Sequence, residues 1–414
     1  MLSRGCWWLS SGPVQPHDSP AEAAFRAEAA AWLDANATRL TDPAVVVSSI
    51  VAEWTPDEEA EQLEIARKWQ RTKFDAGWAG IHWSADHGGR SGTPIEALIF
   101  RQEELHYDVP ADALVVGLDW LGPAVADFAA PQLATEALPA LLSGDSVWCQ
   151  LFSEPAAGSD LAGLETRAAA DGDEWVINGQ KTWTTLAHLA DRGLLIARHD
   201  SEATKHRGLT AFLVDMDSPG VTVNPVRQMT GAANFNEVFL DDVRIPDSRR
   251  LGEIGDGWRV ALTAFAHERF SDSFSNTDAI DALAGVLRGR ELTASQRDRF
   301  AALYARSQAL RYTGLRLLTD ISKGNEPGAE GSVLKLAGPQ LLSEIFEMGL
   351  EIQGPAAAVD TGDDWHAGFL GIPGLIVGGG TPPIQRNIIG ERILGLPPDV
   401  RVDKGLPHRQ VPNR

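Results

Sequence analysis

The feature of this sequence that most constrains its fold is the segment from Gln150 to Thr185, which reads QLFSEPAAGSD and, after an acidic turn, EWVINGQKTWTT. The first part predicts a loop whose small residues leave the main chain open to a phosphate or a flat ring. The second part predicts a strand pair ending in the indole of Trp183 and two hydroxyls. An indole beside hydroxyl donors suits a heterocycle that needs stacking and edge hydrogen bonds. A plain hairpin is the simpler interpretation, but the length and order of the pattern favour a ligand site.

Helical patterns occupy both ends of the chain. Thr55, followed by Pro56 and three acidic residues, predicts a helix start. Farther along, apolar and small residues at alternating steps of four and three predict a bundle helix packed against neighbours. This seam comprises Leu303, Ser307, Leu310, Gly314, Leu317 and Ile321. We expect Pro339, inside the next helical pattern, to kink or restart that helix.

The middle of the chain predicts strands. Short runs rich in β-branched and apolar residues, punctuated by Gly, Pro, Asp and Asn, indicate an antiparallel sheet, either a barrel or a sandwich. The expected fold class is therefore α+β, with a C-terminal part like a four-helix bundle. The expected organisation is a disordered leader at 1–20, an N-terminal helical domain at 21–145, a central β domain at 146–250, a C-terminal helical domain at 251–400 and a tail at 401–414.

The net charge, the apolar runs and the cysteine count of the chain argue against several classes of function. The net charge of −21 argues against a nucleic-acid partner, because phosphate binding needs clustered Lys and Arg. No apolar run is long enough to span a bilayer, so no membrane insertion is predicted. The two cysteines, Cys6 and Cys149, form no disulfide framework, which favours the cytoplasm. Cys149 lies in an apolar run and is expected to be a small buried side chain, and no His or Cys spacing predicts a metal site.

Two blocks of the sequence resemble one known family. SEPAAGSD followed by VINGQKTWTT is similar to the flavin-binding signature of the acyl-CoA dehydrogenase family, and GGTPPIQRNIIGERILG, residues 379–395, is similar to the C-terminal block of that family. The resemblance covers roughly Ala21 to Leu396. The segments LFSEP, FNEVFLDDVRIP and AHER resemble in sequence the actinobacterial members that act on sterol side chains and pair unlike subunits.

The resemblance implies FAD as cofactor. The sequence has no G-x-G-x-x-G between a strand and a helix, so a nicotinamide cofactor in a Rossmann fold is unsupported. By position in the motifs, the FAD ligands would be Leu151, Ser153, Gly158, Ser159, Trp183, Thr185, Gln353, Gly354, Thr381 and Gln385. The family takes some of these from a neighbouring subunit, so a homo- or hetero-oligomer, a dimer or tetramer, is implied. The substrate contacts would be Ser159, Arg269 and Gly379.

The expected position of the catalytic base differs from its position in many family members. Many place a Glu directly before the Gly-Thr of the C-terminal block, where this chain has Gly379. Other members place the base in an E-R pair on the first helix after the sheet domain, and AFAHERF supplies Glu268 and Arg269 there. A carboxylate in an apolar helix is desolvated, as a general base near neutrality requires. Glu268 is therefore the expected base, with a solvated helix residue as the alternative. His267, about 100° away around the helix, is a weaker candidate.

Other departures leave the function open between three candidates. The family segment R-x-x-F-G-x-x-L that grips the FAD pyrophosphate is not recognisable between Ile280 and Phe300, where Arg297 or Arg299 could replace it. The leading expectation is an acyl-CoA dehydrogenase of lipid metabolism and beta-oxidation. It would form a 2,3-enoyl thioester and pass electrons to an electron-transfer flavoprotein. The alternatives are a non-catalytic subunit of a heteromeric enzyme and a flavin oxidase or monooxygenase on the same fold.

Overall fold

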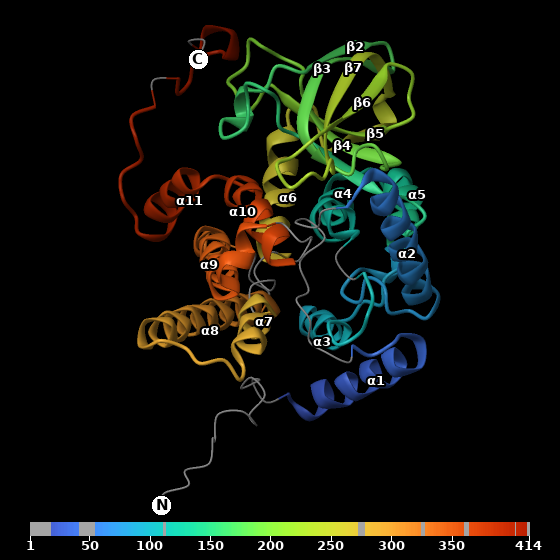
Figure 1. Cartoon of the computed structure of the whole chain (residues 1–414). Coiled ribbons are helices and arrows are strands. Elements are labelled where there is room, and N and C mark those ends of the chain that lie inside the picture. The colour runs from blue at the N-terminus through green and yellow to red at the C-terminus, as the bar shows by residue number, and fades with distance from the viewer. Residues whose placement is uncertain are drawn as a thin grey trace, which may run out of the picture.

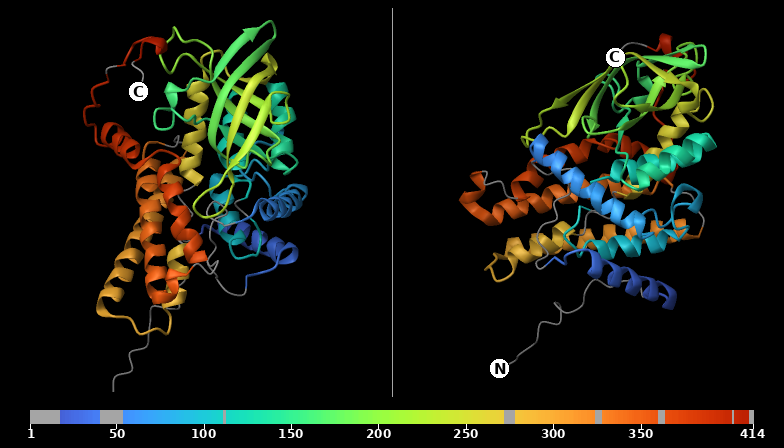
Figure 2. Two further views of the ribbon diagram at one scale, coloured as in Figure 1. Left: turned by 45° about the horizontal axis from the view of Figure 1, so that its top comes forward. Right: turned by 90° about the vertical axis from the view of Figure 1, so that its right-hand side faces the viewer.

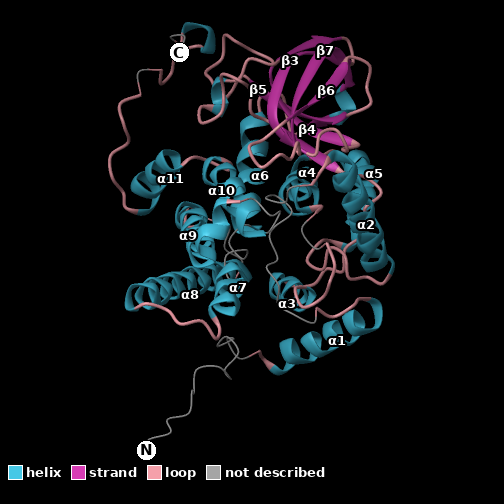
Figure 3. Cartoon of the chain, viewed as in Figure 1, coloured by secondary structure: helices cyan, strands magenta, loops and turns pink. Residues whose placement is uncertain are grey.

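The computed structural model describes residues 18–40, 54–110, 113–271, 278–323, 328–359, 364–401 and 403–411. Most of the expected leader, with Cys6, lies outside these residues. A helical part, a sheet part and a second helical part follow one another along the chain (Figure 1, Figure 3), which confirms the predicted α+β architecture. In the described parts of the chain, no single helix has the length and apolar character to cross a membrane. One bent pair, Trp365–Val377 with Pro382–Ile393, meets those criteria together.

The first helical part begins its helices with a repeated local signal. Ser19, Thr55 and Thr93 each precede a Pro, and each accepts a hydrogen bond from the main-chain N–H of a Glu three residues on. Each Glu side chain bonds back to the main-chain N–H of the capping residue, so two otherwise unpaired donors are satisfied at every start. The elements are α1 Pro20–Asn36, α2 Pro56–Asp75, η1 Ala85–His87, α3 Pro94–Glu104, π-helical η2 Val116–Leu121, α4 Gly122–Phe128 and α5 Pro131–Leu142.

One mixed sheet forms the middle part. Its strands are β1 Trp148–Leu151, β2 Arg167–Asp171, β3 Glu174–Thr185, β4 Arg192–Arg198, β5 Leu209–Asp215, β6 Val221–Val226, β7 Phe235–Pro246 and β8 Arg250–Leu251. They lie in the order β6-β7-β3-β2-β4-β5-β8, with β1 beside β4. The expected antiparallel pairing holds except where β4 meets β1 and β2, which run parallel to it. Along the chain, β2 and β3 come between β1 and β4, and β3 comes between β2 and β4.

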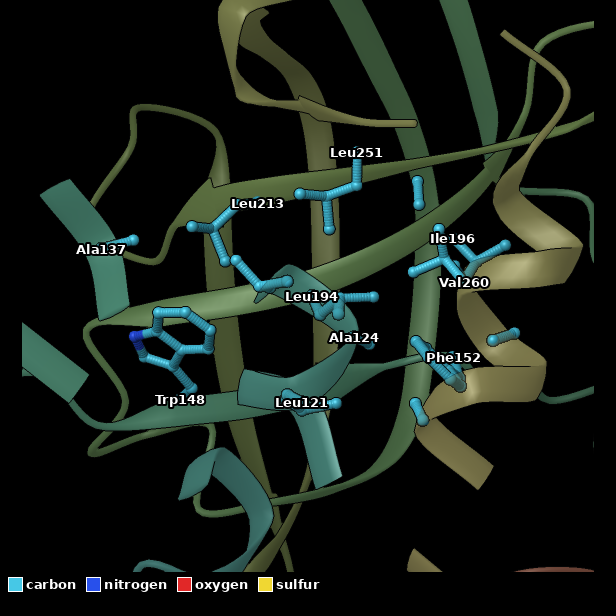
Figure 4. Packing of buried hydrophobic residues seen from close by; sticks show 14 of the residues in the cluster. Leu121, Ala124, Ala137, Trp148, Phe152, Leu194, Ile196, Leu213, Leu251 and Val260 are labelled. Carbon is cyan, nitrogen blue, oxygen red and sulfur yellow. The ribbon is translucent and has the colours of Figure 1, made fainter. Parts of the chain in front are cut away.

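The sheet has a core on each face, which explains the continuous apolar run of β4. Leu194 and Ile196 point to a core shared with α4, α5 and α6 (Figure 4). Leu195 and Ala197 alternate to the other core, as the period of two requires. Cys149 also lies in this second core, where burial raises the pKa of its thiol, so the expectation of a packed, unreactive side chain is confirmed.

The second helical part covers the first core and then leads away from the sheet. Its elements are α6 Gly257–Ser271, α7 Asp278–Leu287, α8 Ala294–Ser322, α9 Gly331–Gln353, α10 Asp364–Val377 and α11 Pro382–Ile388, followed by π-helical η7 Ile389–Ile393. The expected restart at Pro339 is wrong. Helix α9 continues through it, because α7, α8 and α10 pack along α9 and hold it in one piece. After η7 the chain loops back to the sheet part (Figure 2).

A buried ion pair fixes the loop after β1 to β3. The Lys181 Nζ, wholly buried, lies 2.8 Å from Glu154 Oε1 and donates to the main-chain oxygen of Phe152 at 3.0 Å. The Glu154 carboxylate also accepts the main-chain N–H groups of Glu165 and Thr166, at 2.6 and 2.9 Å. Both ends of the segment 154–166 are thereby attached to one carboxylate.

Opposing effects set the charges of this pair. Burial lowers the pKa of Lys181 to about 8, although the neighbouring Glu154 charge works against that shift. Burial acts to raise the pKa of Glu154, but the Lys181 cation and the hydrogen bonds outweigh it, so the pKa of Glu154 is lowered overall. A carboxyl whose pKa is lowered on folding stabilises the folded state above its unfolded pKa. That stability is lost as the pH falls through the folded pKa.

The variant Lys181→Met tests the importance of this pair. It should lower the free energy of unfolding by about 3–5 kcal/mol, because it leaves the Glu154 carboxylate buried without its cation. Urea unfolding at pH 7 measures the change. The matched control is Arg244→Met on the same sheet, whose ion pairs with Asp171 and Glu174 are exposed and should be worth less than about 1 kcal/mol. Equal losses for the two variants would contradict the assignment.

Candidate active site

The indole of Trp183 is presented to solvent by an irregularity in β3. The pairing of β3 with β7 shifts register between Lys181 and Thr184, and Trp183 has a φ of +57°. A bulky residue in the left-handed region is a genuine outlier, and such outliers cluster at functional sites. The indole is 60% exposed, with Phe235 at its edge, and Thr185 beside it is half-buried. This exposed aromatic face can stack on a flat ring.

The loop after β1 presents free main-chain donors and is attached to β3 next to Trp183 in the sequence. The Thr182 N–H donates to the Ser153 oxygen at 2.9 Å, which links the loop to β3. Gly158 and Ser159 are exposed, and within the described chain neither main-chain N–H has a hydrogen-bond acceptor. A Cβ added to Gly158 would meet nothing within 4 Å, so a ligand can approach the loop closely. Leu151 differs, because its side chain is wholly buried in the second core and only its main chain could face a ligand.

Glu268 lies against Gly379. Its carboxylate is 6% exposed, and a Cβ built on Gly379 would lie only 2.4 Å from Glu268 Oε1. Gly379 also has a φ of +62°, which disfavours any side chain. A glutamate at position 379 would therefore collide with the carboxylate that α6 supplies. The two positions that the sequence offers for a base, 268 and 379, therefore lie side by side in the structure.

Lys335 also lies beside Gly379 and was not anticipated from the sequence. Its side chain on α9 is 8% exposed, Nζ donates to the Leu375 oxygen at 2.8 Å, and Cε would lie 3.1 Å from a Cβ on Gly379. The cation and the Glu268 carboxylate thus flank the same glycine, and a nearby positive charge favours an ionised carboxylate. The only signal in the sequence was a lysine within the apolar pattern of α9.

Arg269, the predicted substrate contact next to the base, is half-buried. Burial lowers the pKa of its guanidinium, the Glu268 charge raises it and the Arg392 charge lowers it. Arg392 comes from η7, so the sequence block after Gly379 lies near Arg269. A second cation close to the carboxylate makes this end of α6 suited to an anionic or strongly polar ligand.

The remaining predicted FAD ligands fall into two places. Thr381 is the residue before α11. Gln385 is 1% exposed, and its amide donates to the oxygens of Gly379 and Gly380, so Gln385 holds the loop that contains Gly379. Gln353 and Gly354 lie at the far end of α9. Eighteen residues of helix separate Gln353 from Lys335, about 27 Å. The structure therefore does not bring Gln353 and Gly354 close to Lys335 and Gly379 within one chain.

Arg297 and Arg299, the candidates left open for the pyrophosphate, have other partners. The Arg297 Nη1 donates to the main-chain oxygen of Leu292 at 2.6 Å. The Arg299 guanidinium lies beside the carboxylates of Glu347 and Glu351 on α9. Neither is linked to the loop of Gly158, so the structure gives no reason to prefer one of them.

The C-terminal segment 403–411 is attached to the loop after β1, which carries the SEPAAGSD motif. The Lys205 Nζ lies 2.9 Å from Asp160 and 2.6 Å from Asp403, so one buried cation joins the loop to the segment. His408 is also buried, with its Nε2 2.8 Å from Glu165. His206, next to Lys205, meets the indole of Trp258 at the start of α6 edge-on. Lys205 and the neighbouring His206 therefore join the loop, the C-terminal segment and helix α6.

Sequence models of one family match nearly the whole chain. The N-terminal, middle and C-terminal domains of acyl-CoA dehydrogenases match residues 22–145, 149–243 and 255–394. The acyl-CoA dehydrogenase FadE34 of Mycobacterium tuberculosis is 36% identical over 404 residues, which cover 95% of this chain. The chain spans only 56% of the length of FadE34. The acyl-CoA dehydrogenase IpdE1 of the same organism is 34% identical over 387 residues, covering 91% of this chain and 98% of IpdE1.

Solved structures agree with this match. The steroid ACAD Tcur3481-Tcur3483 superposes with a TM-score of 0.74 at 25% identity, over 92% of this chain and 99% of the other. The ChsE4-ChsE5 complex from M. tuberculosis gives a TM-score of 0.74 at 25% identity, over 93% of this chain and 100% of the other. The fold and the site thus define a flavoprotein oxidoreductase of the three-part, helix–sheet–helix class. The chain belongs to the acyl-CoA dehydrogenase family.

Members of this family bind FAD, and the groups on the sheet side of the site fit that cofactor. The main-chain donors of Gly158 and Ser159 suit hydroxyl or phosphate oxygens. The exposed indole of Trp183 suits the face of a flat ring, and Thr185 can bond its edge. The buried Gln385 Oε1 is without a hydrogen-bond partner in the described chain, which leaves one acceptor open near the base.

The variant Gly379→Ala tests whether Gly379 makes room for Glu268. It should displace the carboxylate and cost about 1–2 kcal/mol of unfolding free energy, because Ala resists the left-handed backbone. Acyl-CoA-driven flavin reduction should fall well beyond what that destabilisation explains. Urea unfolding and stopped-flow absorbance measure the two effects.

Gly374→Ala is the matched control for that variant. Gly374 lies on the neighbouring helix α10, and a Cβ there would meet nothing within 4 Å. Alanine should be neutral there, or stabilising by up to about 1 kcal/mol. Equal behaviour of the two variants in both measurements would show that Gly379 has no special role.

Proposed function

We propose that this protein is an FAD-dependent acyl-CoA dehydrogenase that converts an acyl-CoA thioester into its 2,3-enoyl thioester. The observation that carries the proposal is the buried Glu268 carboxylate in the space that Gly379 leaves open. Membership of the acyl-CoA dehydrogenase family supports the reaction type. The residues around Glu268 support the assignment of the base.

In this proposal Glu268 acts as the general base. It takes the proton from carbon 2 of the acyl group, and the electron pair of that C–H bond forms the new double bond as the hydrogen on carbon 3 leaves with its bonding pair. Bound FAD supplies the acceptor for this hydride, since no amino-acid side chain accepts one. Lys335 keeps Glu268 ionised before the step, and the low exposure of the carboxylate limits its solvation, which makes it a stronger base.

Gly379 has a second role in the proposal. In the described part of the chain, its main-chain N–H has no hydrogen-bond acceptor. A main-chain donor beside the base can bind the thioester oxygen and stabilise the charge that develops there when carbon 2 loses its proton. Ser159 and Arg269 contact the remainder of the thioester in this arrangement. Trp183, Thr185 and the loop of Gly158 hold the cofactor.

We further propose that the chain works in an oligomer in the cytoplasm and passes its electrons to an electron-transfer flavoprotein. The distance along α9 supports the oligomer, because Gln353 and Gly354 could act as cofactor ligands only at a site distant from their own Glu268. Two similar structures bear the names of two proteins each, Tcur3481-Tcur3483 and ChsE4-ChsE5. An unlike partner subunit is therefore the first arrangement to test, by co-purification.

The variant Glu268→Gln tests the proposed reaction. Flavin reduction by an acyl-CoA should slow by about 10²- to 10⁴-fold, because glutamine cannot accept the proton. Stopped-flow bleaching of the flavin absorbance measures the rate, and the flavin content per chain should remain unchanged. The matched control is Glu347→Gln, an exposed carboxylate on α9, which should react like the wild type. Equal bleaching by Glu268→Gln and the wild type would exclude Glu268 as the base.

Two measurements on the wild-type protein separate the alternatives. A chain that binds no flavin and bleaches with no acyl-CoA, alone or with its partner, would be a non-catalytic subunit. Rapid oxygen consumption by the reduced flavin would indicate an oxidase. The proposed dehydrogenase should bleach with acyl-CoA and consume oxygen slowly.

A further inference from the structure

The C-terminal segment 403–411 attaches to the sheet part as a separate small unit. The connection that leads to it, residues 394–401, is exposed along its whole length and forms neither a helix nor a strand (Figure 2). The segment itself contains one short helical turn, His408–Gln410. A segment joined to the rest by an exposed connection can detach while the remainder of the protein stays folded. We call residues 403–411 the strap.

The main chain of the strap pairs with the connection between β4 and β5. Two N–H groups of the strap donate to main-chain oxygens of this connection at 2.9 and 3.1 Å, His408 to Ala203 and Arg409 to Ser201. An isolated antiparallel bridge joins Pro407 to Thr204. This pairing brings the strap alongside Lys205, the next residue of the connection.

Side chains of the strap also contact the loop after β1. The Lys205 side chain is 7% exposed, and its Nζ lies 2.6 Å from Asp403 of the strap and 2.9 Å from Asp160 of the loop. Farther along the loop, Glu165 Oε1 lies 2.8 Å from His408 Nε2. The strap therefore contacts both the β4–β5 connection and the loop, and Lys205 links all three.

The loop residues next to this contact carry the free main-chain donors. Gly158 and Ser159 directly precede Asp160, so the ion pair of Asp160 with Lys205 fixes the main chain beside them. On the other side of Asp160, Leu161 is buried in the first core. A main chain that is already held in place binds a ligand without the entropy cost of ordering it.

The burial of Lys205 explains why the strap affects the loop. A buried cation is stable only where carboxylates or other acceptors surround it. Two carboxylates share the Lys205 ammonium, and one of them, Asp403, belongs to the strap. When the strap detaches, Asp160 alone pairs with the cation, and water reaches the side that Asp403 covered. An exposed ion pair is worth less than a buried one, so the loop is then held less firmly.

We propose that the strap positions the cofactor loop, so that the strap and FAD bind this loop cooperatively. The inference rests on the proposed function, because it takes the loop of Gly158 and Ser159 as part of the FAD site. Asp403 and Lys205 are positioning residues in it, since they act on the cofactor through the main chain of the loop. Linkage requires that the strap tightens FAD binding by the same factor by which FAD holds the strap.

The first test measures FAD affinity without turnover. FAD is titrated into the FAD-free protein, and the change in flavin fluorescence gives the Kd. Asp403→Asn should raise this Kd about 5- to 20-fold, because the population with a bound strap falls. Asp403→Glu, which keeps the carboxylate, should restore most of the affinity. The matched control is Asp399→Asn in the exposed connection, which should bind FAD like the wild type.

The second test observes the strap itself. Lys404 and Arg409 are exposed residues of the strap after which trypsin can cleave. Saturating FAD should slow their cleavage in the wild type by up to about 20-fold, because the coupling is reciprocal. Mass spectrometry of the first products separates cleavage in the strap from cleavage elsewhere. In Asp403→Asn the protection by FAD should be smaller.

The outcomes separate this inference from the proposed function. Equal FAD affinities of Asp403→Asn and the wild type, or strap cleavage that FAD does not slow, would overturn the inference. Tighter FAD binding by Asp403→Asn would also overturn it, because Asp403 would then shield Lys205 from an anionic ligand. Neither measurement needs an acyl-CoA. A wild type whose bound flavin no acyl-CoA bleaches would therefore overturn the proposed function and leave the strap standing, and a wild type that binds no FAD would overturn both.

Discussion

The packing of helix α6 against the sheet is the interaction on which the site depends. Val260, Ala261 and Ala264 lie in the core that α6 shares with β4 and β5, and Phe265 meets Phe152 of the signature loop edge-on at 5.6 Å. Small residues on this face let the helix approach the sheet closely. Glu268 and His267 follow within one turn, so their positions are set by that apolar contact. Any change that tilts α6 therefore moves Glu268, the proposed base, relative to the sheet.

The closeness of Gly379 to Glu268 relates the two positions that the sequence offers for a catalytic base. A Cβ at position 379 would lie 2.4 Å from Glu268 Oε1, so the Glu268 carboxylate could not keep its present place beside a side chain there. In the proposed mechanism, glycine at position 379 leaves space for the Glu268 carboxylate. The main-chain N–H of Gly379 has no hydrogen-bond acceptor among the described residues, and in the proposed mechanism it binds the thioester oxygen. The buried Lys335 gives this arrangement the opposite charge that a desolvated carboxylate needs.

Much of the fold could be predicted from local patterns. The helix starts at Ser19, Thr55 and Thr93 are local, because cap, proline and glutamate lie within four residues. The alternation in β4 and the seam of α8 are likewise periodic signals. The continuity of α9 through Pro339 was not predictable, because tertiary packing along the helix outweighs the local penalty of proline. The parallel pairing of β1 with β4 depends on residues over forty positions apart.

The sequence by itself determined the three-part order of helices, sheet and helices, the signature loop, and Glu268 as one candidate base. These depend on periodicity and on motifs of neighbouring residues. Only the tertiary structure decided that Glu268 lies against Gly379 and that Lys335 lies beside the same glycine. Each of these contacts joins segments dozens to hundreds of residues apart. Their proximity follows from how α6 packs between the sheet and the other helices, which no local pattern records.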